Sequence, residues 1–143
     1  MSETEERVPE PPEGFRRSSR GPFTSHNGPM FHREVEGGPP QHAFFVLGRH
    51  CNSLGIVHGG MLSTFFDGLV AGAVARATGA TPVTVHLSLD FLAMARAGEW
   101  VTGEARVTRQ ARDLVFAEGV VRVGTREVLR GSGVFKPMHR KAG

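Results

Sequence analysis

The sequence has a single cysteine, Cys51, among its 143 residues, so no disulfide can form within the chain. It also lacks an apolar run of the roughly 18–20 residues that a membrane span requires, because residues 61–77 are interrupted by Asp67 and Arg76. The first residues are charged and proline-rich, which does not fit a signal peptide. These absences lead us to expect a cytoplasmic protein with no membrane partner.

Basic clusters and metal-ligand spacings are missing as well. The 17 Lys+Arg residues nearly balance the 14 Asp+Glu residues, and no run of them alternates with aromatic residues. We therefore expect no nucleic-acid partner. The seven histidines show neither the His-x-x-x-His nor the HExxH spacing of a zinc site, so we expect no metal. Cys51 adjoins His50, but neighbouring loop residues rarely form a nucleophile pair, and we interpret Cys51 as a packed thiol.

The composition divides the chain into three parts. Residues 1–40 hold most of the nine prolines and few aliphatic residues, which predicts an N-terminal extension with little regular structure. Residues 41–137 have the hydrophobic patterning of one folded domain, and residues 138–143 form a C-terminal tail. Four hydrophobic residues of the extension are candidates for packing on the domain surface: Phe15, Phe23, Met30 and Phe31.

A long helix is predicted from Gly60 onwards. Hydrophobic residues recur at i, i+3 and i+4 and form one wide apolar stripe. Gly79 is typical of a helix C-terminus, which gives the helix about five turns. The stripe consists of Met61, Leu62, Phe65, Phe66, Leu69, Val70, Ala73 and Val74.

Five strands are predicted around this helix. One covers residues 43–49, before the helix, and the other four follow it. Short links between the later four indicate antiparallel neighbours, so we expect a meander. Wrapping this antiparallel sheet around the apolar helix buries it most simply, which predicts an α+β fold. The later strands cover residues 83–91, 99–109, 114–123 and 127–135. In the strand at 83–91, one face is hydrophobic and consists of Val83, Val85, Leu87, Leu89 and Phe91.

The segment HCNSLGIVHGG before the helix combines several features of a binding site for an oxyanion. A helix start leaves backbone N–H groups without partners, and Gly59 and Gly60 have no side chain to keep a ligand away. The helix dipole adds partial positive charge there. Together these groups could stabilise a carbonyl oxygen that becomes negative during a reaction.

Asp67 is the only charged residue between positions 61 and 75. On a helical wheel it points roughly 140° away from the centre of the apolar stripe. It could be an ordinary hydrated surface acid, as most helix acids are. The scarcity of charge favours a second face that is also covered, and a covered carboxylate indicates function. The other residues on this face are small: Gly60, Ser63 and Ala71.

The pattern N-x-x-G-x-x-H-G-G, with an acid nine residues after the histidine, resembles the hotdog-fold acyl-CoA thioesterases, specifically the phenylacetate-degradation (PaaI-like) branch. Here it begins at Asn52, reaches His58 and ends with Asp67. The resemblance covers about residues 43–136. It implies a hotdog fold, in which one long central helix is wrapped by an antiparallel sheet.

The resemblance also implies roles for five residues. Asp67 would act as general base for a water molecule or as nucleophile toward the thioester carbonyl. Gly59 would donate its backbone N–H to the thioester oxygen. Asn52 would position water or substrate, His58 would order the loop, and the hydroxyl of Thr84 would assist the water.

Further residues are candidates for substrate contact. Gly60 and Ser63 lie close to the proposed oxyanion site, and no G-x-S-x-G elbow marks Ser63 as a nucleophile. Arg96 and Arg112 flank loops and could bind the phosphates of CoA, although solvated surface arginines are the simpler alternative. His86 is interpreted as a surface or interface residue.

The implied reaction is hydrolysis of an acyl-CoA substrate to a free acid and CoA, with no cofactor beyond the substrate itself. The family resemblance implies a homodimer as the minimal unit, with the loop from one subunit and the acid from the other, and a homotetramer as the assembly. Two alternatives stay open: a non-catalytic acyl-CoA-binding domain, and a hydratase or dehydratase that uses a histidine base.

Overall fold

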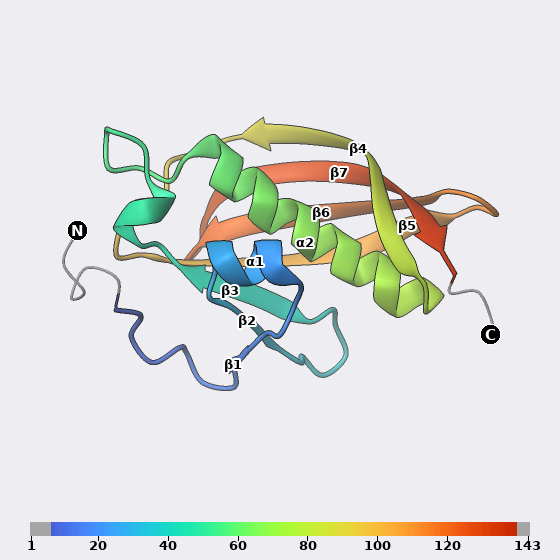
Figure 1. Cartoon of the computed structure of the whole chain (residues 1–143), viewed down its shortest axis with the longest axis horizontal. Coiled ribbons are helices and arrows are strands. Elements are labelled where there is room, and N and C mark those ends of the chain that lie inside the picture. Colours follow the sequence, from blue (N-terminus) through green and yellow to red (C-terminus); the bar gives the residue numbers. More distant parts are fainter. Residues whose placement is uncertain (1–6, 140–143) are drawn as a thin grey trace.

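The computed structural model describes residues 7–139, in which a seven-stranded antiparallel sheet curves around one long helix (Figure 1). This architecture confirms the predicted α+β hotdog fold. The helices are α1 (Pro22–Asn27) and α2 (Gly59–Thr78), with a 3-10 turn at Gly48–His50. The strands are β1 (Arg16–Arg17), β2 (Met30–Arg33), β3 (Gln41–Phe45), β4 (Thr81–Phe91), β5 (Trp100–Gln110), β6 (Val115–Val123) and β7 (Arg126–Met138).

Helix α2 forms the centre of the core. Every residue of the predicted stripe is buried except Ala73, which is partly buried, and the stripe packs against the inner face of the sheet. The helix ends at Gly79, which has φ of 70° in the left-handed region, as predicted for a glycine C-cap. Within residues 7–139, no helix combines the length and hydrophobicity that crossing a membrane requires.

The strand order β1-β2-β3-β5-β6-β7-β4 corrects one prediction. Strands β5, β6 and β7 form the expected meander, but β4 pairs with β7 and not with β5. The reason lies in the link that follows β4. Val57 donates its N–H to Ala95 O, and Val46 donates to Glu99 O, so the link is held against the loop before α2. It therefore crosses the end of the sheet instead of turning back.

Strand β4 is an edge strand, and this position overturns part of its predicted burial. Val83, Val85 and Phe91 are 49%, 56% and 53% exposed. Only Leu87 and Leu89 pack against the core. The alternation of the sequence was consistent with one buried face, but the pairing with β7 shifts its register between Thr84 and His86. Thr84 therefore faces α2, where it contacts Asp67, and Val83 beside it points away from the helix.

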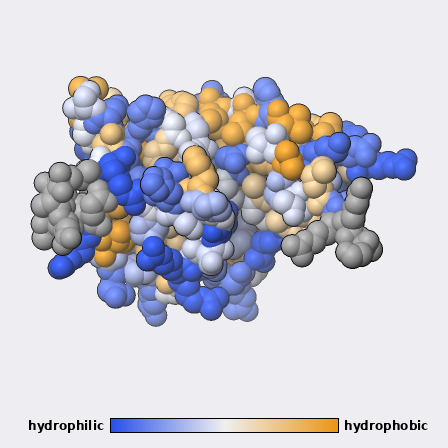
Figure 2. All heavy atoms as spheres, in the orientation of Figure 1, coloured by the Kyte–Doolittle hydropathy of each residue, from blue (hydrophilic) through white to orange (hydrophobic). Residues whose placement is uncertain are grey.

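We call Val83, Val85, Phe91 and Leu92 the β4 edge patch, because all four are large, hydrophobic and exposed. Figure 2 shows hydrophobic surface along the upper edge of the molecule, where Figure 1 places β4. A sheet edge carries unpaired backbone N–H and C=O groups, which favour pairing with another chain.

The predicted lack of regular structure in residues 1–40 is wrong for residues 16–33. Strand β2 pairs with β3, and β1 pairs with β2, so the N-terminal segment extends the sheet. Phe15 and Phe31 are buried with Ala43, and Met30 joins the main core. Of the four residues expected to pack, only Phe23 is exposed, at 66%. The apolar contacts of the segment therefore stabilise structure that its composition does not predict. The first predicted strand, residues 43–49, is also shifted: β3 covers Gln41–Phe45, and the 3-10 turn follows.

Candidate functional site

Asp67 lies on the second face of α2, where it is partly buried. Its Oδ1 accepts a hydrogen bond of 2.6 Å from the hydroxyl of Thr84, on β4. A cleft of about 250 Å³ opens beside it. Asp67 is therefore not a freely hydrated surface acid, since a strand hydroxyl orients it and the cleft leaves room for a ligand. The cleft is lined by Ser63, Thr64, Asp67 and Gly68 of α2 and by Phe23 and Thr24 of α1.

The two glycines at the start of α2 have different hydrogen-bonding roles. His58 is the N-cap, and its Nδ1 accepts a hydrogen bond of 2.8 Å from the Gly60 N–H. A Cβ at Gly60 would lie 2.9 Å from that nitrogen, so a side chain there would displace the imidazole. No atom within residues 7–139 accepts from the Gly59 N–H. The Gly59 N–H is therefore available to a ligand, whereas Gly60 serves the cap.

Asn52 organises the loop before α2. Its side-chain oxygen accepts from the N–H of Leu54 at 2.9 Å and from the N–H of Ile56 at 3.4 Å. Gly55 between them has φ of 75°, a conformation that glycine adopts without strain. The carboxamide oxygen is thus used inside the loop, where Asn52 fixes the path of the chain toward His58.

Gly59 and Asp67 cannot act on one carbonyl within one chain. They lie on the same helix eight positions apart, which corresponds to roughly 12 Å along the helix axis. A thioester carbonyl bound to the Gly59 N–H is therefore out of reach of the carboxylate of the same copy. A complete site needs a second donor near Asp67 or a second copy of the chain.

The hydroxyls that follow Gly60 are engaged in the helix. Ser63 Oγ donates to Gly59 O at 2.7 Å, and Thr64 Oγ1 donates to Gly60 O at 2.9 Å. Such bonds to the preceding turn are common for Ser and Thr within helices. Ser63 lines the cleft, and its predicted contact with substrate stays a prediction. Its hydroxyl donates to a backbone carbonyl, a bond that does not activate it as a nucleophile.

The two arginines predicted to bind CoA lie far apart within the chain. Arg96 is close to the loop before α2, because it forms a β-bridge with Ile56, and its side chain is exposed. Arg112 lies in the turn between β5 and β6, beyond the opposite end of α2 (Figure 1). Only Arg96 is therefore near the Gly59 end of the same copy.

Residue Phe91 is a neighbour of the site that the sequence did not indicate. A Cβ at Gly59 would lie 3.7 Å from its ring, so the ring stands beside the free N–H. Its place in the alternation of β4 made it a core candidate, and only the edge position of the strand shows otherwise. Phe23 and Thr24 were missed because a six-residue helix has no readable periodicity.

The remaining histidines and the cysteine have structural contacts. His50 is buried; its Nδ1 accepts from the Leu47 N–H at 3.0 Å, and its Nε2 donates to Asn27 O at 2.7 Å. Burial raises the pKa of the Cys51 thiol, which agrees with a packed role. His86 is exposed on β4. Across residues 7–139, no three His, Cys, Asp or Glu side chains gather as a metal site.

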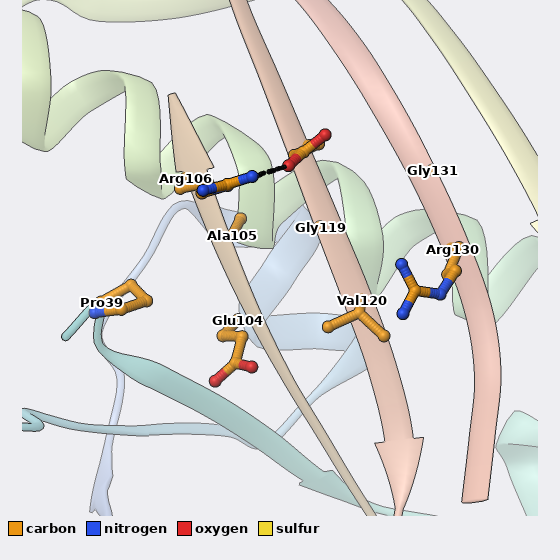
Figure 3. Close-up of a pocket in the computed structure, with 9 residues that line it drawn as sticks. Pro39, Glu104, Ala105, Arg106, Gly119, Val120, Arg130 and Gly131 are labelled. Atoms are coloured by element: carbon orange, nitrogen blue, oxygen red, sulfur yellow. Dashed lines mark hydrogen bonds and ion pairs between the residues drawn. The ribbon is translucent and has the colours of Figure 1, made fainter. Parts of the chain in front are cut away.

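A separate cleft of about 300 Å³ lies on the outer face of β5, β6 and β7, away from Asp67 (Figure 3). Arg106 and Glu118 form an ion pair of 2.6 Å within it. Arg130, which also lines it, pairs with Glu127 at 2.5 Å. The charged side chains of this cleft are paired with one another or with neighbours, and none of the residues around Asp67 lines it. The cleft is therefore a poorer candidate for a catalytic site than the one beside Asp67.

With this geometry in place, comparison with known proteins identifies the family. The family model described as the thioesterase superfamily matches residues 54–129, which include the start of α2, Asp67 and Thr84. The chain belongs to the thioesterase superfamily. The predicted resemblance to hotdog thioesterases is thereby confirmed.

Relatives of this thioesterase-superfamily chain agree with the assignment. A candidate esterase of Pseudomonas aeruginosa, PA0474, is 39% identical over 127 residues, which are 87% of this chain and 95% of the relative. Mouse acyl-coenzyme A thioesterase 13 is 31% identical over 70 residues, and the match spans about half of each protein, 48% and 50%. A solved phenylacetic acid degradation-related protein of Ralstonia eutropha has a TM-score of 0.72 and 26% identity, covering 82% of this chain and 92% of that one.

Proposed function

We propose that the protein hydrolyses an acyl-CoA thioester to a free acid and CoA, with Asp67 as general base or nucleophile and the Gly59 N–H as oxyanion donor. The observation that carries this proposal is the Asp67 carboxylate, held by Thr84 beside an open cleft on an otherwise uncharged helix face. Membership of the thioesterase superfamily and the likeness to acyl-coenzyme A thioesterase 13 support the reaction and the CoA ester.

As a general base, Asp67 takes a proton from water while the water oxygen attacks the thioester carbonyl carbon. The carbonyl oxygen becomes negative and is stabilised by the Gly59 N–H and the start of α2. The C–S bond then breaks, and the CoA sulfur leaves as a thiolate that takes up a proton. As a nucleophile, Asp67 would attack the carbonyl carbon itself, and water would cleave the resulting anhydride. Neither route requires a metal or a bound cofactor.

We further propose that two copies of the chain complete each site. The separation of Gly59 and Asp67 along α2, roughly 12 Å, supports a site in which one copy supplies the N–H and another the carboxylate. The β4 edge patch supports pairing at the edge next to Asp67, since Thr84 lies on that strand. A dimer would thus be the minimal unit, and a tetramer of two such dimers is the assembly we expect.

Replacing Asp67 tests the proposed chemistry. Asp67→Asn keeps the size of the side chain and an acceptor for Thr84, but it removes the base and the nucleophile. We expect the rate of CoA release to fall on the order of a hundredfold or more. The measurement is thiol release from a panel of acyl-CoA esters, with thermal unfolding to show that the variant folds.

Glu36→Gln, at an exposed acid in the turn between β2 and β3, is the matched control and should retain the wild-type rate. Near-normal turnover by Asp67→Asn would overturn the mechanism. Wild-type protein that binds acyl-CoA without releasing thiol would favour the non-catalytic alternative, and addition of water to an enoyl-CoA would favour the hydratase.

A further inference from the structure

The cleft beside Asp67 has one wall that lies outside the residues matched by the thioesterase family model. Phe23 and Thr24 of α1 line this wall, whereas the family match begins at residue 54. Phe23 is 66% exposed. An apolar group placed in the cleft would therefore cover surface that the chain alone leaves in water, which favours its binding there.

One end of this wall is fixed to α2 by Arg20. Its Nη1 donates to Gly68 O at 3.0 Å, and its Nη2 donates to His42 Nδ1 at 3.2 Å. The two helix glycines beneath it make room for the guanidinium. A Cβ at Gly68 would lie 3.2 Å from Nη1, and a Cβ at Gly72 would lie 3.5 Å from Nη2. Arg20 is thus seated in a gap of the helix surface.

The other end of α1 is fixed by the 3-10 turn before the active-site loop. His50 donates from Nε2 to Asn27 O at 2.7 Å. Arg49 donates to the carbonyl oxygens of His26, at 3.2 Å, and Gly28. The wall is therefore held at one end by Arg20 and at the other by Arg49 and His50, whose backbone leads directly into the loop before α2.

The cleft is also small. Its volume of about 250 Å³ is slightly below the roughly 300–1,000 Å³ of typical small-molecule sites. A further cavity of about 20 Å³ adjoins it, because both are lined by Thr64 and Gly68. That cavity has room for about one water molecule and is also lined by Arg20 and His42. A chain extending along α2 from Asp67 would meet the Arg20 guanidinium.

We propose that α1 sets the acyl preference of the enzyme: Phe23 is the wall against which the acyl group packs, and Arg20 closes the far end. Compact acyl groups, either short or carrying a single ring, fit this cleft, and long chains do not. The inference rests on the proposed thioesterase function, because the acyl group is placed by its carbonyl at Asp67.

The test is a comparison of kcat/KM for hexanoyl-, phenylacetyl- and palmitoyl-CoA. Wild-type protein should prefer the two compact esters by about tenfold or more. Phe23→Ala should lower kcat/KM for the compact esters about tenfold, because it removes the packing surface. Arg20→Ala should raise the relative rate with palmitoyl-CoA, because it opens the far end. Val35→Ala, at an exposed residue in the turn between β2 and β3, should leave the preference unchanged.

The outcomes separate this inference from the function on which it rests. If wild-type protein hydrolyses no acyl-CoA, the proposed function fails, and the acyl preference fails with it. If it hydrolyses these esters but shows no preference for the compact ones, or if Phe23→Ala and Arg20→Ala leave the preference as it was, the inference alone is overturned.

Discussion

Gly59 and Gly60 are adjacent glycines with different physical roles. The Gly60 N–H is bonded to the imidazole of His58, and the lack of a side chain at Gly60 leaves space for that ring. Gly59 has an open N–H at the start of a 20-residue helix, where the helix dipole adds to its pull on a negative oxygen. At the scale of the residue, the proposed chemistry therefore depends on one N–H group and one carboxylate.

Gly59→Pro removes that N–H and is compatible with the backbone. Proline is well tolerated at the first position of a helix, and His58 before it has φ of −62° and ψ of 137°, as a residue preceding proline prefers. We expect a folded protein whose kcat falls about a hundredfold or more. Steady-state kinetics and circular dichroism measure the two effects. Turnover at the wild-type rate would exclude the Gly59 N–H as oxyanion donor.

At the scale of the element, the N-terminal segment contains a partly buried pair of basic side chains, Arg20 and His42. His42 lies on β3 beside Arg20, and its Nδ1 accepts from the guanidinium. Burial, together with the positive charge of Arg20, lowers the pKa of His42 to about 4. The imidazole is therefore neutral in the folded protein at neutral pH, which allows it to accept this hydrogen bond.

This shift predicts a specific loss of stability in acid. Between pH 6.5 and about 4 the unfolded chain binds a proton at His42 and the folded chain does not, so the free energy of unfolding falls as the pH falls. The loss is on the order of 3 kcal/mol once the pH is below about 4. Denaturant unfolding of wild-type and His42→Gln protein across this range should show a shallower dependence in the variant. His139→Gln, at an exposed histidine, should match the wild type, and identical curves for all three proteins would contradict the assignment.

The sequence was informative where a pattern is local. Helix α2, its glycine C-cap and the loop from Asn52 to His58 follow from periodicity and turn residues. Helix α1 does not, because six residues carry no period. It is held in place by Arg49 and His50, which bond to its last residues, and by Arg20, which ties the chain just before it to α2. The pairing of β4 with β7 was missed because it depends on a link anchored to a distant loop.

The contact between Asp67 and Thr84 could not be predicted from a local sequence pattern. Their contact joins α2 to β4 at 2.6 Å, and only the resemblance to hotdog thioesterases suggested a role for Thr84 in the sequence. The contribution of α1 to the Asp67 cleft had no sequence signal, since it arises where α1 packs beside the second face of α2.

At the scale of the whole molecule, the chain exposes a hydrophobic sheet edge, the β4 edge patch, that a second copy could cover. Val83 and Val85 of the β4 edge patch lie on either side of Thr84, which contacts Asp67. Burial of such side chains on association gains roughly 25 cal/mol per Å². Pairing along β4 would place a second copy next to the Asp67 cleft, which is the arrangement that a shared site requires.

Subunit complementation tests this shared site most directly. Asp67→Asn and Gly59→Pro chains each lack one half of the proposed machinery, and each should be about a hundredfold or more below the wild-type rate. When the two are unfolded together and refolded as a mixture, a mixed dimer contains one site with both the intact carboxylate and the intact N–H. We predict that the mixture recovers a substantial part of the wild-type rate of thioester hydrolysis. A mixture in which mixed dimers form, but which is no more active than the separate variants, would contradict a site built from two copies.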